Sequence, residues 1–290
     1  MQNNNQKKVL ITGANTGMGL ATAIALAKAG YPLILGCRNQ SAMQQAIAQI
    51  QQQVPAAHVQ GFVLDLADLD SVRQFVDTVS QQCEQLYCLL LNAGVMNPPY
   101  ALTKDGFEQQ FQINYLGHFL LTQLLLPLLL KNPRSKVISI SSLSSEKGVI
   151  DKAEDFFVLA KVSATDYVPM KSYRESKLAQ VLMTAELQRR YAADGLLAAA
   201  IHPGIVNTDL FYRRMSPLMK ALMMPLVWLG YATGKFKTPA QGAATAIQLV
   251  QSDSFVGGRY WADGKERIAN PRMEDLELAK SLWNLSEQAV

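Results

Sequence analysis

The sequence predicts a doubly wound α/β fold, in which one parallel sheet carries helices on both faces. Short runs of Val, Ile and Leu alternate with longer segments of helical periodicity, as they do in βαβ units. The strand-like runs are almost continuously apolar, which suits strands that are buried on both faces. No internal repeat and no Ser-, Pro- or Gly-rich linker divides the 290 residues. We therefore expect a single domain over residues 1–290.

The elements follow in order along the chain. The predicted strands are Lys8–Ile11, Pro32–Gly36, His58–Leu64, Tyr87–Leu91, Lys136–Ile140, Leu197–Ile201 and Gly258–Trp261. The predicted helices are Gly17–Ala29, Ser41–Gln53, Leu69–Gln82, Asp105–Leu130, Tyr173–Tyr191, Pro239–Leu249 and Asp275–Gln288. Two insertions, residues 143–172 and 209–237, interrupt the alternation, and insertions beyond strand ends are where α/β enzymes build substrate pockets.

Composition excludes several classes of protein. With 49% hydrophobic and 17% charged residues, the chain is neither disordered nor fibrous. A net charge of +4 with scattered basic residues predicts no nucleic-acid partner. Three cysteines fit neither a disulfide framework nor a zinc site, and the start lacks an apolar signal-peptide core. We therefore expect a cytoplasmic protein without a metal. No apolar stretch reaches the roughly 18 residues of a membrane span, so we also expect no transmembrane segment.

A glycine-rich turn follows the first predicted strand and opens the first predicted helix, which is the context of a dinucleotide-binding fingerprint. Gly13 would allow the tight turn, Gly17 the close approach of a pyrophosphate, and Gly19 the packing of helix on strand. A purely structural turn between strand and helix is the alternative. The predicted cofactor loop comprises Gly13, Asn15, Thr16, Gly17, Met18 and Gly19.

The end of the second predicted strand indicates which nicotinamide cofactor is bound. An NAD enzyme would place an acidic residue there for the ribose hydroxyls, but this chain has Arg38 instead. A guanidinium can hold a 2′-phosphate through charge-assisted hydrogen bonds, so the sequence favours NADP(H); a solvated surface arginine is the alternative. Asp65, before Leu66, either accepts a hydrogen bond from the adenine amino group or caps the next turn.

Tyr173 and Lys177 lie at i and i+4 of a predicted helix, on one face. A neighbouring cation can lower the pKa of a phenol by roughly 1–3 units, toward the range in which general acid–base catalysis is effective. By itself such a pair is usually a surface pair. Polar motifs that end three neighbouring predicted strands give it a different context, because the carboxyl edge of a parallel sheet binds ligands. These motifs are Asn92-Ala93-Gly94, Ser141-Ser142 and His202-Pro203-Gly204.

Together with Asn114, these motifs occur in the order of the short-chain dehydrogenase/reductase family, which the sequence resembles. The resemblance implies a Rossmann-like fold and hydride transfer with NADP(H). It implies that Tyr173 is the proton donor or acceptor at the substrate oxygen and that Ser142, rather than Ser141, hydrogen-bonds this oxygen. It implies that Lys177 lowers the pKa of the tyrosine and binds the nicotinamide ribose, and that Asn114 holds a water in the proton relay. The other implied cofactor contacts are Asp65, Leu66, Asn92, Ala93, Gly94, Tyr173, Pro203, Gly204, Val206 and Thr208, the last of them to the carboxamide.

Within the family, the runs Asn114–Leu121 and Tyr173–Leu178 resemble the branch that holds retinol dehydrogenases and light-dependent protochlorophyllide reductases. The tail Leu282–Glu287 is similar to that of the photoenzymes, but Ala179 and Gln180 stand where those enzymes carry a cysteine. We therefore expect a dark NADP(H)-dependent oxidoreductase acting on a lipophilic carbonyl or alcohol. A protochlorophyllide reductase-like enzyme and a non-catalytic NADP(H)-binding sensor are the alternatives.

The second insertion contains an apolar, methionine-rich segment, Pro217–Leu229. Methionine adapts to varied ligand shapes, so one interpretation is a lid over a lipophilic substrate. A buried helix, a contact in a homo-oligomer and shallow peripheral contact with a membrane fit the same composition.

Overall fold

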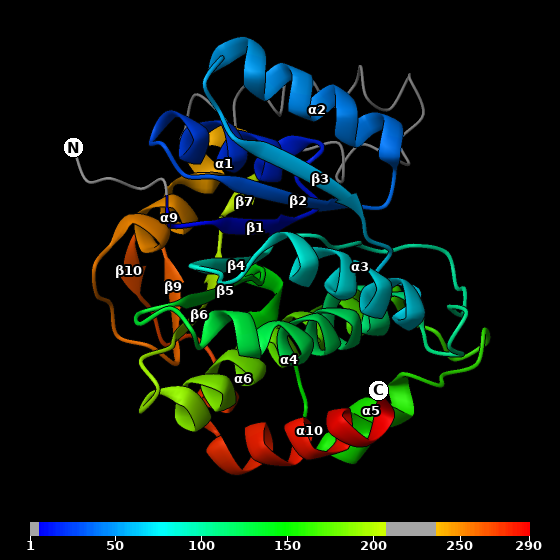
Figure 1. Cartoon of the computed structure of the whole chain (residues 1–290). Helices are drawn as coiled ribbons and strands as arrows, with labels where there is room; N and C mark the ends of the chain where they lie inside the picture. Colours follow the sequence, from blue (N-terminus) through cyan, green and yellow to red (C-terminus); the bar gives the residue numbers. More distant parts are fainter. Residues whose placement is uncertain (1–5, 207–235) are drawn as a thin grey trace.

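The computed structural model describes residues 6–206 and 236–290, and it confirms the doubly wound α/β fold (Figure 1). An eight-stranded sheet runs in the order β10-β9-β6-β5-β4-β1-β2-β3, and its strands are parallel except for β10. Its strands are β1 (Val9–Thr12), β2 (Leu33–Cys37), β3 (Val59–Val63), β4 (Cys88–Leu91), β5 (Lys136–Ile140), β6 (Leu197–His202), β9 (Arg259–Ala262) and β10 (Lys265–Glu266). The strand order reverses between β1 and β4, which is where ligands bind in such sheets.

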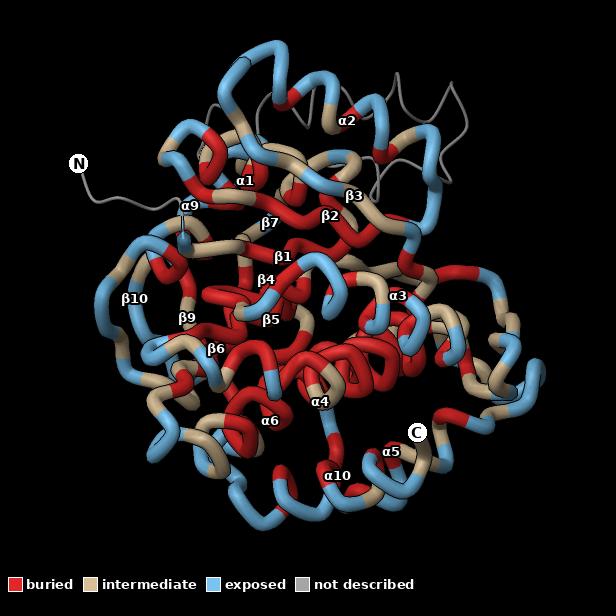
Figure 2. Tube along the Cα trace, viewed as in Figure 1, coloured by how far each residue is buried: buried red, intermediate tan, exposed pale blue. Residues whose placement is uncertain are grey.

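The helices cover both faces of the sheet (Figure 1). They are α1 (Gly17–Lys28), α2 (Gln40–Gln53), α3 (Leu69–Gln82), α4 (Gly117–Leu129), α5 (Ala153–Leu159), α6 (Pro169–Tyr191), α9 (Pro239–Gln251) and α10 (Leu276–Ala289), with the π-helix η2 (Phe111–Leu116) and the 3₁₀ helices η3 (Leu143–Lys147) and η4 (Pro271–Glu274). Successive side chains of a strand point to opposite faces of the sheet and pack in two separate hydrophobic cores. Leu10 packs with α3, α4 and α6, whereas Ile11 packs with α1 and α9. Figure 2 shows the buried strands between these layers.

Most strand boundaries agree with the sequence prediction to within one residue, but two helix starts differ. The helix predicted from Asp105 begins later, because Gly106 adopts φ +82° in a turn and the Glu108 carboxylate accepts the backbone N–H groups of Gln110 and Phe111, both at 2.9 Å. Helix α6 begins at Pro169, so Tyr173 lies in its second turn. Pro is favoured in the first turn of a helix, where its missing N–H would have no partner.

The first predicted insertion, residues 143–172, forms η3, α5 and the start of α6. Asn270 ties it to the C-terminal part of the chain by donating from Nδ2 to the Gly148 carbonyl at 2.9 Å. Of the second insertion, the structure describes only Phe236–Lys237, which forms β8 and pairs with β7 (Ile205–Val206). Thr208 and Pro217–Leu229 lie outside the described residues. Within the described ranges, no helix has both the length and the hydropathy to cross a membrane.

Candidate functional site

The glycine-rich turn after β1 has the shape that a pyrophosphate needs. Gly13 and Gly17 adopt φ of +65° and +55°, which other residues rarely tolerate. A Cβ on Gly19 would lie 2.5 Å from Asn92 Nδ2 and 2.6 Å from the Gly13 carbonyl oxygen. The first turn of α1 carries no acidic side chain, so its N-terminus favours an anion. Backbone and glycines therefore fit the phosphates of a dinucleotide.

A buried histidine connects the glycine turn to the residues after β4. Thr12 Oγ1 accepts hydrogen bonds from the backbone N–H groups of Asn92 and Ala93, at 2.9 and 3.0 Å. The same oxygen lies 3.0 Å from His118 Nε2, while His118 Nδ1 lies 3.1 Å from the Asn114 carbonyl. Because a carbonyl only accepts, Nδ1 carries the proton and Nε2 accepts from the threonine. Burial lowers the pKa of His118 to about 3, so the ring is neutral.

Asn114 lies in the π-helix, a feature that is frequent at functional sites. Its side chain holds the backbone of Val95 from both sides: Oδ1 accepts from the N–H at 2.8 Å and Nδ2 donates to the C=O at 3.0 Å. Nδ2 also donates to Ser176 Oγ at 3.0 Å. A Cβ on Gly94 would lie 3.1 Å from Asn114 Oδ1 and 3.3 Å from Lys177 Nζ. The fold thus brings Gly94, Asn114 and Lys177 together from three separate elements.

Tyr173 and Lys177 lie on one face of α6, as predicted, and both are buried. Lys177 Nζ lies 5.9 Å from the centroid of the Tyr173 ring. Burial lowers the pKa of the Lys177 ammonium to about 7. Burial also raises the pKa of the Tyr173 phenol, and a hydrogen bond with Ser142 opposes this rise. The lowering of the phenol pKa expected from Lys177 is therefore not the dominant effect here, because removal from water penalises both charged forms.

The two neighbouring serines have different partners. Ser141 Oγ donates to the carbonyl of Lys177 at 2.7 Å, so its hydroxyl is bonded to the backbone of α6. Ser142 hydrogen-bonds the side chain of Tyr173, and its Oγ accepts from the Ser144 N–H at 3.1 Å at the start of η3. Ser142 is thus the serine whose side chain lies next to the phenol, and its role toward the substrate oxygen stays a prediction.

Arg38 follows β2 at the exposed rim of the site. Its neighbour Asn39 caps α2, since Asn39 Oδ1 accepts from the Ala42 N–H at 2.8 Å. Asp65 Oδ1 accepts from the Ala67 N–H at 3.0 Å, so Asp65 does cap the turn that follows β3. Leu66, the next residue, is buried.

The last predicted contacts follow β6. Gly204 adopts φ +85°, and its N–H donates to His202 Nδ1 at 2.9 Å. Val206 lies in β7 against α9, where a Cβ on Gly242 would lie 2.5 Å from Val206 Cγ2 and 3.4 Å from Met18 Sδ. Val206 and Met18 therefore meet beside the start of α1. Pro203 precedes Gly204 in the same turn.

Sequence patterns did not reveal a support behind Ser142. The Tyr260 hydroxyl, from β9, donates to the Ser142 carbonyl at 3.2 Å and lies 3.4 Å from Glu146 Oε1. Arg267 donates to the other oxygen of Glu146 at 2.8 Å. These partners are more than a hundred residues from Glu146 or Ser142 along the chain, so no local signal marks them.

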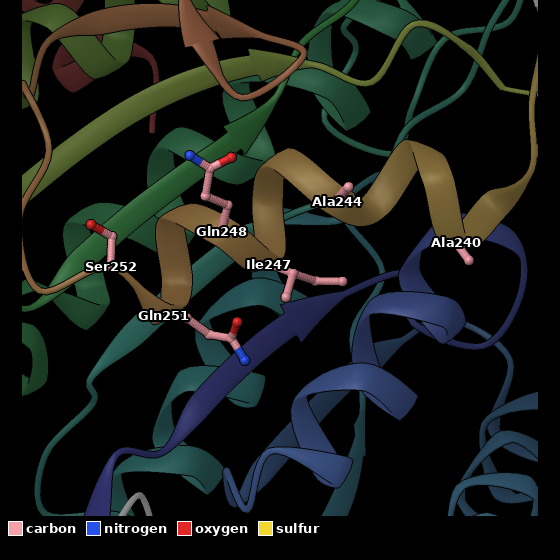
Figure 3. Close-up of a pocket in the computed structure, with 6 residues that line it drawn as sticks. All are labelled: Ala240, Ala244, Ile247, Gln248, Gln251 and Ser252. Carbon is pink, nitrogen blue, oxygen red and sulfur yellow. The ribbon is translucent and has the colours of Figure 1, made fainter. Parts of the chain in front are cut away.

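A hollow on the solvent side of α9 is not part of this site (Figure 3). None of the residues that line it is among the predicted site residues. They are Ala240, Ala244, Ile247, Gln248, Gln251 and Ser252.

Comparison with known proteins agrees with this geometry. The chain matches the family of short chain dehydrogenases over residues 7–154. It is 40% identical to retinol dehydrogenase 14 of Mus musculus, over 98% of this chain and 86% of that protein. It is 37% identical to retinol dehydrogenase 13 of Homo sapiens, over 98% of this chain and 84% of that protein. The chain therefore belongs to the short-chain dehydrogenase/reductase family of oxidoreductases, in the retinol dehydrogenase branch.

Solved structures share the fold. An uncharacterized protein from Mycobacterium paratuberculosis superposes with a TM-score of 0.75 at 35% identity, over 98% of this chain and 93% of that one. An NADPH-bound short chain oxidoreductase from Pseudomonas aeruginosa PAO1 superposes with a TM-score of 0.69 at 18% identity, over 88% of this chain and 94% of that one. Family membership implies a nicotinamide cofactor, and the glycine turn described above fits one.

Proposed function

We propose that this protein is an NADP(H)-dependent oxidoreductase that interconverts a carbonyl and an alcohol on a lipophilic substrate. The observation that carries the proposal is the meeting of Ser142, Tyr173 and Lys177 at the carboxyl edge of the sheet, next to the glycine turn. A sensor that only binds NADP(H) has no use for these three side chains together. In this proposal the whole chain acts as one domain, and its cytoplasmic location stays a prediction.

Each residue has a distinct part in the proposed reaction. A nicotinamide cofactor held at the glycine turn would supply or accept the hydride. In the direction of reduction, Tyr173 donates its phenolic proton to the substrate oxygen, and Ser142 donates a hydrogen bond to that oxygen as negative charge develops. The Lys177 ammonium stabilises the phenolate that Tyr173 leaves behind. Asn114 fixes the backbone at Val95. In this proposal it also holds a water in the relay that returns a proton to Tyr173.

Cofactor and substrate preferences are part of the same proposal. The chain has Arg38, and no acidic residue, directly after β2, and the Arg38 guanidinium would bind the 2′-phosphate of NADP(H). The contacts we propose for the cofactor are those predicted from the sequence, from Gly13 to Thr208. Similarity to retinol dehydrogenases supports a lipophilic substrate. Contact with a membrane surface and a homo-oligomer remain predictions.

The direct test is NADPH oxidation by the purified protein, in darkness, with retinal, alkyl and aryl aldehydes, quinones and steroid ketones as substrates. We expect turnover with at least one apolar carbonyl compound, and faster turnover with NADPH than with NADH. Turnover that requires both protochlorophyllide and light would support the photochemical alternative. NADPH binding without turnover on any of these substrates would support the sensor and contradict the proposal.

Replacing Ser142 by Ala should lower kcat by about 10²–10³-fold, the usual effect of removing a donor to a developing oxyanion. Ser141→Ala is the matched control, because the Ser141 hydroxyl bonds the α6 backbone instead. This control should lower the melting temperature and leave kcat close to the wild-type value. Equal losses of kcat in both variants, measured in parallel, would show that Ser142 has no special role.

A further inference from the structure

Gln180 lies one turn after Lys177 on α6, and its side chain is fully buried. Its Oε1 accepts a hydrogen bond from Lys177 Nζ at 2.9 Å. The carbonyl oxygen of Ile140, at the end of β5, accepts a second one at 2.9 Å. The strand end and the Gln180 carboxamide therefore hold the amino group of Lys177 between them.

The orientation of the carboxamide is explained by the lysine. Gln180 Nε2 is buried and has no hydrogen-bond partner within the described ranges. A buried donor without a partner is unfavourable, so the burial of this carboxamide needs a favourable contact at its other end. Turning the amide over would place Nε2 against the donors of Lys177 and would lose the one hydrogen bond that the side chain makes. Among the contacts described, the bond from Lys177 is thus the one that compensates for the burial of the Gln180 carboxamide.

Other groups around Lys177 do not supply an opposite charge. Tyr173 faces Lys177 from the same helix, and Asn114 faces it from η2. His118, on α4, is neutral and lies close enough that the charge of Lys177 contributes to its low pKa. The described residues place no carboxylate in an ion pair with Lys177, and burial lowers its pKa to about 7. A neutral acceptor can favour the ammonium without cancelling the charge that acts on Tyr173.

We propose that Gln180 is a positioning residue that fixes the Lys177 amino group beside Tyr173 and favours its protonated form. This inference rests on the proposed function, since it assigns to Gln180 the support of the group that stabilises the Tyr173 phenolate. Gln180 itself does not touch the substrate in this scheme. It acts through Lys177 alone.

The test uses three substitutions that change the acceptor in different ways. Gln180→Leu removes the acceptor, Gln180→Glu makes it anionic, and Gln180→Asn keeps a carboxamide that is one methylene shorter. Thr184→Val is the matched control, because Thr184 is equally buried on α6 and its hydroxyl bonds only the Val181 carbonyl at 2.9 Å among the contacts described. Thermal unfolding of every variant shows whether it folds.

The first readout needs no turnover. With ¹³C-labelled lysine, the NMR signal of Lys177 Cε, assigned with Lys177→Met, reports protonation of the amino group in the cofactor-free protein. Losing an acceptor destabilises the charged form, so Gln180→Leu should lower the midpoint by about one pH unit. Gln180→Glu should raise the midpoint by at least as much, Gln180→Asn should lie between Leu and wild type, and Thr184→Val should match wild type. A common midpoint for the Leu, Glu and wild-type proteins would overturn the proposal.

The second readout is the pH dependence of kcat with a carbonyl substrate that the wild type reduces. Because Lys177 acts as the ammonium, activity should fall as pH rises through its midpoint. That fall should occur at lower pH in Gln180→Leu, with kcat up to about tenfold lower at pH 8 for a shift of one pH unit, and at higher pH in Gln180→Glu. If the Gln180 variants were less stable but kept the pH profile of the wild type, Gln180 would have only a packing role. If Tyr173→Phe kept full turnover, the proposed function would fail, whereas the NMR midpoints would still decide whether Gln180 controls Lys177.

Discussion

Tyr173→Phe is expected to lower kcat for carbonyl reduction by roughly 10²–10⁴-fold, the usual contribution of general acid–base catalysis. Phenylalanine keeps the ring that packs beside Lys177 and removes only the hydroxyl that bonds Ser142. The affinity for NADPH, measured by fluorescence titration, should therefore change by no more than about twofold, which is under half a kcal/mol. Steady-state kinetics with NADPH and the best carbonyl substrate provide the measurement.

Tyr115→Phe is the matched control for this loss. The Tyr115 hydroxyl is also buried and also bonds a serine, Ser286, at 2.7 Å, but it faces α10 instead of the site. We expect this control to be less stable by about 1 kcal/mol, the net worth of a typical hydrogen bond, with kcat close to wild type. Unchanged turnover in Tyr173→Phe would refute the assignment of the phenol as proton donor.

Arg38→Asp is expected to weaken NADPH binding by about 10²-fold, because charge-assisted hydrogen bonds to the 2′-phosphate are lost and a like charge replaces them. Binding of NADH should stay within about threefold of wild type or improve, since a carboxylate after the second strand suits the ribose hydroxyls. The ratio of kcat/KM for the two cofactors is the quantity to measure. Arg38 is exposed, so the fold should tolerate the change.

Lys131→Asp controls for the change in net charge. Lys131 is also exposed, but it follows α4 at the opposite edge of the sheet, before β5 begins. It should change both cofactors by the same small factor, through the long-range field alone. If Arg38→Asp weakened NADPH and NADH equally, Arg38 would not bind the phosphate and the preference for NADP(H) would be withdrawn.

Elements with a regular local pattern were predictable from the sequence. Strand β5 has the predicted bounds, and β1, β2 and β4 begin and end within one residue of prediction, because a buried parallel strand is a short apolar run wherever it occurs. Strands β7, β8 and β10 were missed, since two residues carry no periodicity. The start of the helix predicted from Asp105 was wrong, because the turn at Gly106 and the capping carboxylate of Glu108 outweigh the helical pattern.

Within the candidate site, the sequence by itself determined the parts whose spacing is local. Glycines at 13, 17 and 19 follow a strand, and Tyr173 and Lys177 share a helix face, because one turn of backbone sets those distances. For the two serines, the choice of Ser142 came from the family resemblance, whereas the tertiary structure shows that the Ser141 hydroxyl bonds the α6 backbone and that the Ser142 side chain lies at Tyr173. Only the tertiary structure joined His118 to Thr12, 106 positions away, and showed that Gln180 bonds Lys177 rather than another neighbour. Such contacts depend on how helices pack against the sheet, and this packing is determined by the whole core rather than by any one segment.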